Sequence, residues 1–468
     1  MHPIKPNMEQ SNNRLIKKEM LNQLTLLSLP LALQSMFGFM VDLLGTVMLG
    51  TLGEVEISAA ALSNQVFLIL SLLVFGCVGG SNVLVAQLWG QGNKKDIHKV
   101  LAYTYRIGLG SAAVFALGAY FAPDRILSVF TRDRRVIEEG ISYLRIISVS
   151  YIFYTAVNLT TGTLRAVGKV KIAVVLSAIS LVTSGFFNWV LIFGSLGNHP
   201  MGVKGAALAT VIARGVELVC LLFYMVYRED ELKIRIKSLW RIDKTIGRKY
   251  FSNTLPVIMN ELIWAIGSSV LAVIMGRLGT EFVAANSIFS VTGQLASVLA
   301  QGFSAAAAVM IGNAIGFGDT NRVLLLKKLL QAVGLVTGVG SALMILGLRP
   351  FMLSLYHVND LTLSYANQIM YTGAVIQVFK TAQGMNMMGI LRGGGDARFV
   401  MINDIIFLWV LAIPLGFLAG PVFGLPVPVV YAVLNIEQFI KLFTSGARLK
   451  GNQWIKRIEL KEELCHFQ

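Results

Sequence analysis

Twelve long apolar stretches run through the chain of 468 residues and restrict its possible folds more than any other feature. A helix needs about 20 residues to cross the roughly 30 Å hydrocarbon core of a bilayer, and most of the stretches reach that length. A membrane-spanning barrel would instead need short segments of alternating polarity, which the sequence lacks. The predicted spans are 24–49, 58–88, 101–121, 140–162, 170–195, 202–227, 254–276, 282–312, 328–348, 363–388, 400–420 and 425–445.

The composition favours the same fold class. The chain is 55% hydrophobic and 14% charged, with a mean hydropathy of +0.67. A soluble domain carries roughly a quarter charged residues. The sequence therefore predicts an all-α polytopic membrane protein with 12 transmembrane helices.

The sequence also contains an internal repeat. Apolar runs open at Pro30 and at Pro256, a spacing of 226 in the numbering, and the same spacing recurs through much of each half. A nearly gapless repeat of this length predicts two six-helix bundles of similar structure. The matching residues are Gly50 and Gly276, Gly90-Gln91-Gly92-Asn93 and Gly316-Phe317-Gly318-Asp319, and, at a spacing of 227, Leu164-Arg165 with Gly168 and Leu391-Arg392 with Gly395.

Basic residues are distributed unevenly between alternate connections. With the N-terminus placed in the cytoplasm, the inside segments hold 28 Lys and Arg residues and the outside segments hold 7. This asymmetry is the positive-inside signature of membrane proteins. It explains the net charge of +15 without nucleic acid as a partner. The basic segment 228–250 is predicted to be a solvated linker near anionic lipid headgroups.

An even number of helices per repeat gives both halves the same orientation in the bilayer. Such halves are related by an axis along the membrane normal and enclose a central cleft, as in one class of transporters. Two rocking lobes favour a carrier over a channel. The predicted division is a cytoplasmic N-terminal segment 1–23, a first lobe 24–227, a cytoplasmic linker 228–253, a second lobe 254–445 and a cytoplasmic C-terminal tail 446–468.

Sequence motifs of enzymes and primary pumps do not occur. The stretch from Gly162 to Gly168-Lys169-Val170 has the wrong spacing for a P-loop and lacks its Ser or Thr. The five histidines are scattered, without the spacing of a metal site. We therefore expect no catalytic residue, no metal and no cofactor.

Short motifs in both halves resemble a known family, the multidrug and toxic compound extrusion (MATE) transporters, over roughly residues 24–445. The resemblance implies a two-lobed antiporter with 12 helices, which uses an inward H⁺ or Na⁺ gradient to expel organic, often cationic, compounds. The motifs are Leu29-Pro30, Thr46-Val-Met-Leu-Gly50-Thr-Leu-Gly53, Ala59-Ala-Ala-Leu-Ser-Asn-Gln65, Ala86-Gln-Leu-Trp-Gly-Gln-Gly92, Leu255-Pro-Val-Ile-Met-Asn-Glu-Leu-Ile-Trp264, Met275-Gly-Arg-Leu-Gly279, Leu391-Arg-Gly-Gly-Gly-Asp396, Asp404, Trp409 and Ile413-Pro414-Leu415-Gly416.

A gradient-driven antiporter needs a group inside the membrane whose charge changes when the coupling ion binds. Burial makes a carboxylate sensitive to such an ion, and ionisable residues at this depth are usually functional. The candidate coupling residues are Glu261, Asp404 and Asp42. Asp404 is expected to approach the same cavity as Glu261. The alternative for each acid is an ion pair with a buried Lys or Arg, or a position at the interface.

The first half departs from the family pattern at the acidic position. Gly45 stands where the family has Asp, and Asp42 lies one helical turn earlier. In the second half, Trp264 stands where many family members have an acid, and Glu261 lies one helical turn before it. The second lobe, with Glu261 and Asp404, is therefore the favoured coupling site.

Other charges inside the predicted spans are expected to be structural. Arg214 and Glu217 are three residues apart, and Glu437 and Lys441 are four apart, so each pair can meet on one helix face. Lys380 has no acid within a turn, and it could pair with Glu261 or Asp404.

Bending points and a cargo cavity are predicted from residue type. Proline removes a backbone donor, which makes Pro30, Pro256 and Pro414 candidate bending points, with a static kink as the alternative. Aromatic faces attract organic cations and methionines adapt to varied shapes; packing between helices is the alternative for each cavity residue. The candidate cavity residues are Trp264, Asn260, Gln34, Asn188, Met259 and Phe289.

The sequence thus predicts a secondary active multidrug efflux transporter. It is expected to exchange H⁺ or Na⁺ for organic, cationic amphiphilic compounds by rocker-switch alternating access. The alternative is a lipid-linked precursor flippase, whose cargo has a diphosphate head; few unpaired Lys or Arg residues lie in the predicted helices, which favours cationic or neutral cargo. We expect a monomer in the plasma membrane of a bacterium, with both termini in the cytoplasm. Its expected partners are membrane lipid and small-molecule cargo.

Overall fold

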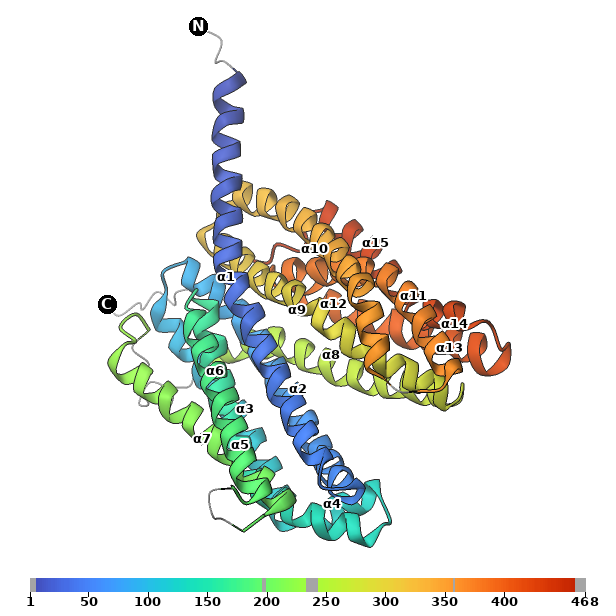
Figure 1. Cartoon of the computed structure of the whole chain (residues 1–468). Helices are drawn as coiled ribbons and strands as arrows, with labels where there is room; N and C mark the ends of the chain where they lie inside the picture. Colours follow the sequence, from blue (N-terminus) through green and yellow to red (C-terminus); the bar gives the residue numbers. More distant parts are fainter. Residues whose placement is uncertain (1–5, 196–198, 233–242, 357, 459–468) are drawn as a thin grey trace, which may run out of the picture. The chain divides into compact units, whose positions relative to one another are not determined.

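The computed structural model describes residues 6–195, 199–232, 243–356 and 358–458, which form helices and no β-strand. Each of the twelve predicted spans coincides with a helical segment, which confirms the polytopic helical fold (Figure 1). Within the described residues, eleven helices are long and apolar enough to cross a membrane; Asp360–Gly384 is not among them. The helices are α1 (Pro6–Gly50), α2 (Glu54–Gly90), α3 (Lys94–Phe121), α4 (Pro123–Phe130), α5 (Arg134–Ala166), α6 (Lys171–Phe193), α7 (Gly202–Tyr227), α8 (Lys244–Gly276), α9 (Thr280–Phe317), α10 (Thr320–Leu355), α11 (Asp360–Gly384), η3 (Met385–Leu391), α12 (Ala397–Ile405), η4 (Ile406–Ala412), α13 (Ile413–Phe417), η5 (Leu418–Val422), α14 (Val427–Leu434) and α15 (Ile436–Lys450).

The N-terminal caps of two helices repeat with the same spacing as the sequence. The α3 helix is capped by Asn93, whose side chain accepts a hydrogen bond from the backbone N–H of Asp96. The α10 helix, which stands at the equivalent place in the second half, is capped in the same way by Asp319. Asn and Asp side chains satisfy the free N–H groups of a helix start. The two halves therefore begin equivalent helices by the same means.

Packing divides the chain into two compact units. Unit 1 contains the described residues up to Ala32, residues Ala86–Gln91 and the described residues from Ile263 onward. Unit 2 contains Leu33–Val85 and the described residues of Gly92–Leu262. In Figure 1, α3, α5 and α7 run together in unit 2, and α9, α10 and α11 run together in unit 1.

The units exchange equivalent helix segments. In unit 1, Gly302 of α9 packs so closely on the N-terminal part of α1 that a Cβ atom there would lie 2.5 Å from the Ser28 carbonyl oxygen. In unit 2, the equivalent Gly76 of α2 packs on the N-terminal part of α8, where a Cβ atom would lie 2.7 Å from Cα of Ile258. Small residues at helix crossings allow such close approach in membranes. Thus α1 and α8 each start in the unit formed mainly by the other half.

This exchange places unit boundaries inside α1 and α8, at Ala32/Leu33 and Leu262/Ile263, and a further boundary lies inside α2, at Val85/Ala86. The predicted lobes, 24–227 and 254–445, follow the order of the spans along the chain, whereas the units follow packing. Movement of the lobes as rigid bodies stays a prediction. The predicted linker 228–253 is described at both ends, while residues 233–242 lie outside the described residues. The same is true of residues 1–5 and 459–468 in the predicted terminal segments.

Each unit has its own apolar core. In unit 2 the core includes Leu70, Leu144 and Tyr151 from α2 and α5. In unit 1 it includes Phe282 and Ile345 from α9 and α10. These residues are almost fully buried, so each unit holds a rigid framework on which polar side chains can be positioned.

Candidate functional site

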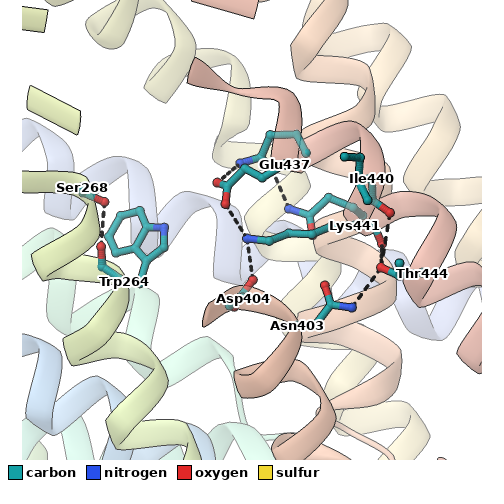
Figure 2. A network of polar contacts seen from close by, with 10 residues as sticks. Trp264, Ser268, Asn403, Asp404, Glu437, Ile440, Lys441 and Thr444 are labelled. Atoms are coloured by element: carbon teal, nitrogen blue, oxygen red, sulfur yellow. Dashed lines mark hydrogen bonds and ion pairs between the residues drawn. The ribbon is translucent and has the colours of Figure 1, made fainter. Parts of the chain in front are cut away.

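A buried ionic cluster in unit 1 contains one of the predicted coupling acids. The Nζ atom of Lys441 on α15 lies 2.7 Å from Oδ1 of Asp404 on α12 and 2.8 Å from Oε2 of Glu437 on α15. The side chains of Lys441, Asp404 and Glu437 are 3%, 11% and 5% exposed. Figure 2 shows the Lys441 ammonium between the two carboxylates. The Glu437–Lys441 pair is confirmed, and Asp404 extends it to a second helix.

Neighbouring polar groups hold this cluster in place. Gln438 donates to the Glu437 carboxylate at 2.9 Å, and Asn403, next to Asp404, donates to the Thr444 hydroxyl at 2.9 Å. Lys380 of α11 interacts electrostatically with Glu437; a direct partnership with Asp404 or Glu261 stays a prediction. Buried ionic groups are tolerated only when they are paired and hydrogen-bonded, and this cluster meets that condition.

A second ionic group lies in unit 2. Arg214 of α7 is 3.1 Å from the Glu217 carboxylate, which confirms the predicted pair. The guanidinium also lies over the Tyr154 ring at 5.0 Å from its centroid. Asp42 of α1, which is exposed, is within electrostatic range of Arg214 and Tyr154. The first-half candidate acid therefore interacts at longer range with a cation on another helix.

The third candidate acid, Glu261 of α8, is buried at 8% exposure and packs in unit 2. Asp404 packs in unit 1, so a cavity shared by the two acids stays a prediction. Asn260, beside Glu261, is also buried, and its side-chain oxygen has no hydrogen-bond partner within the described part of the chain. Met259 is 37% exposed. This part of α8 thus carries a polar group with spare bonding capacity.

Trp264 lies one turn further along α8, in unit 1. Its side chain is 47% exposed, and Figure 2 shows the indole ring on the side facing Asp404 and Lys441. A half-exposed aromatic face can receive an organic cation. The role of Trp264 in a cargo cavity stays a prediction.

The other candidate cavity residues have different surroundings. Gln34 of α1 is partly buried, and Asn188 of α6 is buried and donates to the Ser184 hydroxyl at 3.1 Å. Phe289 of α9 packs in the core of unit 1, with its ring 5.6 Å from that of Tyr431. Among the candidates, Phe289 is the one whose described contacts are those of a residue packed in the core.

The candidate bending prolines fall into two groups. Pro30 and Pro256 lie inside the uninterrupted helices α1 and α8. Pro414 lies in the first turn of α13, between the π-helical segments η4 and η5. Local π-helix is common at functional sites. Bending at any of these positions stays a prediction.

The partnership of Asp404 with Lys441 was not evident from the sequence. Spacing along one helix indicates the Glu437–Lys441 pair, but it cannot show which acid on another helix completes it. The same limit applies to Asp42 and Arg214, which lie on α1 and α7. The sequence does hold one signal of a partner on another helix: neither Asp404 nor Asp42 has a Lys or Arg within one helical turn along the chain.

Comparisons with known proteins match both halves of the chain. The MatE family model matches residues 30–190 and 256–418, one match in each half. The probable multidrug resistance protein NorM of Agrobacterium fabrum (strain C58 / ATCC 33970) is 26% identical over 388 residues, which cover 79% of this chain and 82% of the relative.

Solved structures share the fold. A MOP superfamily transporter from Pyrococcus furiosus aligns with a TM-score of 0.85 at 17% identity, covering 95% of this chain and 98% of the other. A mutant of the Vibrio cholerae MATE transporter VcmN aligns with a TM-score of 0.85 at 15% identity, covering 94% of this chain and 100% of the other.

Proposed function

The chain belongs to the MatE family of membrane transporters, and from that premise we propose that it is a secondary active multidrug efflux transporter. It exchanges H⁺ or Na⁺ for organic, cationic amphiphilic compounds by rocker-switch alternating access. Family membership makes it a transporter of small molecules rather than an enzyme. The name of its relative, a probable multidrug resistance protein, supports the choice of cargo.

The observation that carries the proposal is the buried cluster around Lys441. Two carboxylates, Asp404 and Glu437, share one ammonium at hydrogen-bonding distance. Opposite charges at this distance interact strongly where water is scarce. A cation that arrives from solution can replace Lys441 at one carboxylate while the other keeps its partner. The cluster is therefore suited to exchanging cations.

Coupling requires that ion and cargo compete for the same negative charge. In the proposed cycle, cargo and the inward-moving ion alternately satisfy Asp404, and Lys441 keeps the site neutral enough between the two events. Differential binding of the two states is what allows a ligand to shift a conformational equilibrium. Glu261 in the same half, and Asp42 within electrostatic range of Arg214, are the further candidates for ion coupling.

Cargo selection follows from the same charges. The Trp264 face attracts organic cations. A diphosphate head group would instead need unpaired Lys or Arg residues. Lys441 and Arg214 are each paired with acids, so these two cations favour cationic over anionic cargo. The remaining cavity candidates, expected to add polar and flexible contacts, are Asn260, Met259, Gln34 and Asn188.

We place the protein in the plasma membrane of a bacterium as a monomer, with both termini in the cytoplasm. The asymmetry of Lys and Arg between alternate connections supports this orientation. Membrane lipid surrounds the helices, and no nucleic acid or cofactor takes part. The bound species in the proposed cycle are the cargo and the coupling ion.

The test is dye export by vesicles that contain the purified chain. Ethidium export is measured after separate pH and Na⁺ jumps, which identifies the coupling ion. We expect Glu261→Gln and Asp404→Asn to lose gradient-driven export, and the matched variant Glu138→Gln, at an exposed acid near the start of α5, to keep it. Undiminished export in a variant that neutralises Glu261, Asp404 and Asp42 together would refute the coupling mechanism.

A further inference from the structure

The last long helix of each half is followed by a short segment that folds back onto its own unit. The first strap, Arg228–Leu232, follows α7 in unit 2, and the second strap, Gly451–Ile458, follows α15 in unit 1. Leu232 and Trp454, one in each strap, are almost completely buried. Both segments are therefore packed parts of the fold.

The two straps bind equivalent turns. In the first half, the N–H of Lys169 donates to the Leu164 carbonyl at 2.8 Å, and Gly168 precedes it with φ +85°. In the second half, the N–H of Asp396 donates to the Leu391 carbonyl at 3.0 Å, after Gly395 with φ +90°. Only glycine adopts such a left-handed conformation without strain. The turns are the same structure, placed once in each half of the repeat.

Each turn holds its strap by an ion pair, and the two pairs occupy equivalent positions with opposite polarity. Lys169 of the first turn lies 2.8 Å from Glu229 of the first strap. Asp396 of the second turn lies 2.5 Å from Lys456 of the second strap. Turn and strap residues keep the same repeat spacing of 227 (396 − 169 and 456 − 229), yet acid and base have changed places. In each half the carboxylate is the buried member.

The reversed polarity makes each strap specific for its own half. If the straps exchanged turns, Lys169 would face Lys456 and Asp396 would face Glu229. Like charges placed together are unfavourable, and such repulsion is a known means of excluding a wrong partner. Each strap is thus kept on the turn where it is observed.

The second strap also binds the end of α2. The Gln87 side chain donates to the Lys456 carbonyl at 3.1 Å and accepts from the Ile458 N–H at 2.9 Å. The Gln91 side chain donates to the Ile458 carbonyl at 3.0 Å. These glutamines belong to Ala86–Gln91, the short stretch that packs in unit 1, whereas α2 up to Val85 packs in unit 2.

We propose that the second strap is a latch that holds the end of α2 in unit 1, and that its release is a step of the transport cycle. The α2 helix is continuous through the point where it changes unit, so a movement of unit 2 pulls on the residues that the strap binds. Hinge and shear movements act through such shared elements. The latch rests on the transport function proposed above.

The test uses the full-length chain in lipid nanodiscs and in vesicles. Gln87→Leu combined with Gln91→Leu removes the three strap hydrogen bonds and leaves the Asp396–Lys456 pair intact. Trypsin cleavage after Lys456 and Arg457, read by mass spectrometry, reports the population of released strap. We expect cleavage to accelerate roughly tenfold or more, because each lost hydrogen bond changes an equilibrium several-fold, and we expect the rate of dye export to change.

Two further variants keep the result interpretable. Asn452→Ala, at an exposed position of the same strap, is the matched control and should behave like the wild type. Lys456→Gln breaks only the ion pair and serves if the glutamine variant fails to fold; it too should speed cleavage after Arg457.

An unchanged cleavage rate in both strap variants would overturn the latch, and so would faster cleavage with wild-type export, since the strap would then be only a structural seal. Cleavage needs no cargo. If the wild type exports no dye, the proposed function fails, and the cleavage rates alone decide whether the strap holds α2.

Discussion

Replacing Lys441 with Met should destabilise the folded protein by about 3–5 kcal/mol, the usual cost of removing one partner from a buried ion pair. Met keeps the length and apolar stem of Lys but leaves Asp404 and Glu437 without their shared cation. Their side chains are 11% and 5% exposed, so water can replace little of what is lost. For a chain of this size, roughly 2 °C per kcal/mol corresponds to a fall of about 6–10 °C in apparent melting temperature.

The assay is the fraction of purified protein that stays monodisperse after heating in detergent. A triple variant, Lys441→Met with Asp404→Asn and Glu437→Gln, removes all three charges and should recover most of the loss, because neutral groups of similar shape replace a buried ion pair at little cost. Lys380→Met is the matched control, since Lys380 acts on Glu437 only at longer range. The reasoning is wrong if Lys441→Met has the same apparent melting temperature as the wild type, or if the triple variant is no more stable than Lys441→Met alone.

Two other predictions concern the ends and crossings of helices. The hydrogen bond from Lys99 holds the pKa of Asp243 below its usual value of 3.8; this stability is present above pH 3.8 and lost as pH falls through the lower folded pKa. Asp243→Asn, which keeps the helix cap, should therefore lose about 0.5 kcal/mol at neutral pH and approach the wild type as the solution is acidified through that pKa, and a constant difference would contradict the assignment. Gly302→Ala should destabilise the folded protein by about 1–3 kcal/mol, because the added methyl group would contact the Ser28 carbonyl. The control Gly340→Ala has open space around it and should stabilise α10 by up to about 1 kcal/mol. Equal melting temperatures for the two variants would show that the α1–α9 crossing is loose.

The positions of the helices could be predicted from the sequence because hydrophobic length is a local property. The stretches at 58–88 and 282–312 became α2 and α9, and the repeat spacing of 226 reappears in the capping residues Asn93 and Asp319. Ion pairs within one helix, such as Arg214–Glu217, were equally predictable. These features depend only on neighbours along the chain.

Features that depend on contacts between distant segments could not be predicted. Nothing in the apolar pattern of 24–49 shows that α1 starts in the unit formed mainly by the second half, because that depends on where Gly302 permits a close crossing. The joining of Asp404 to Lys441 depends on the relative rotation of α12 and α15. The strap at Gly451–Ile458 is short, so the sequence predicted it only as part of a cytoplasmic C-terminal tail.

The exchange of helix segments between the two units has a consequence for biosynthesis. Unit 2 contains the first part of α8, up to Leu262, so a ribosome that has inserted only the first six spans has not yet supplied all of it. Unit 1, in turn, takes in the start of α1, which cannot reach its final packing until α9 emerges. Neither half can reach its final packing before the other has been made, and a chain stopped near residue 243 would leave two incomplete surfaces facing lipid.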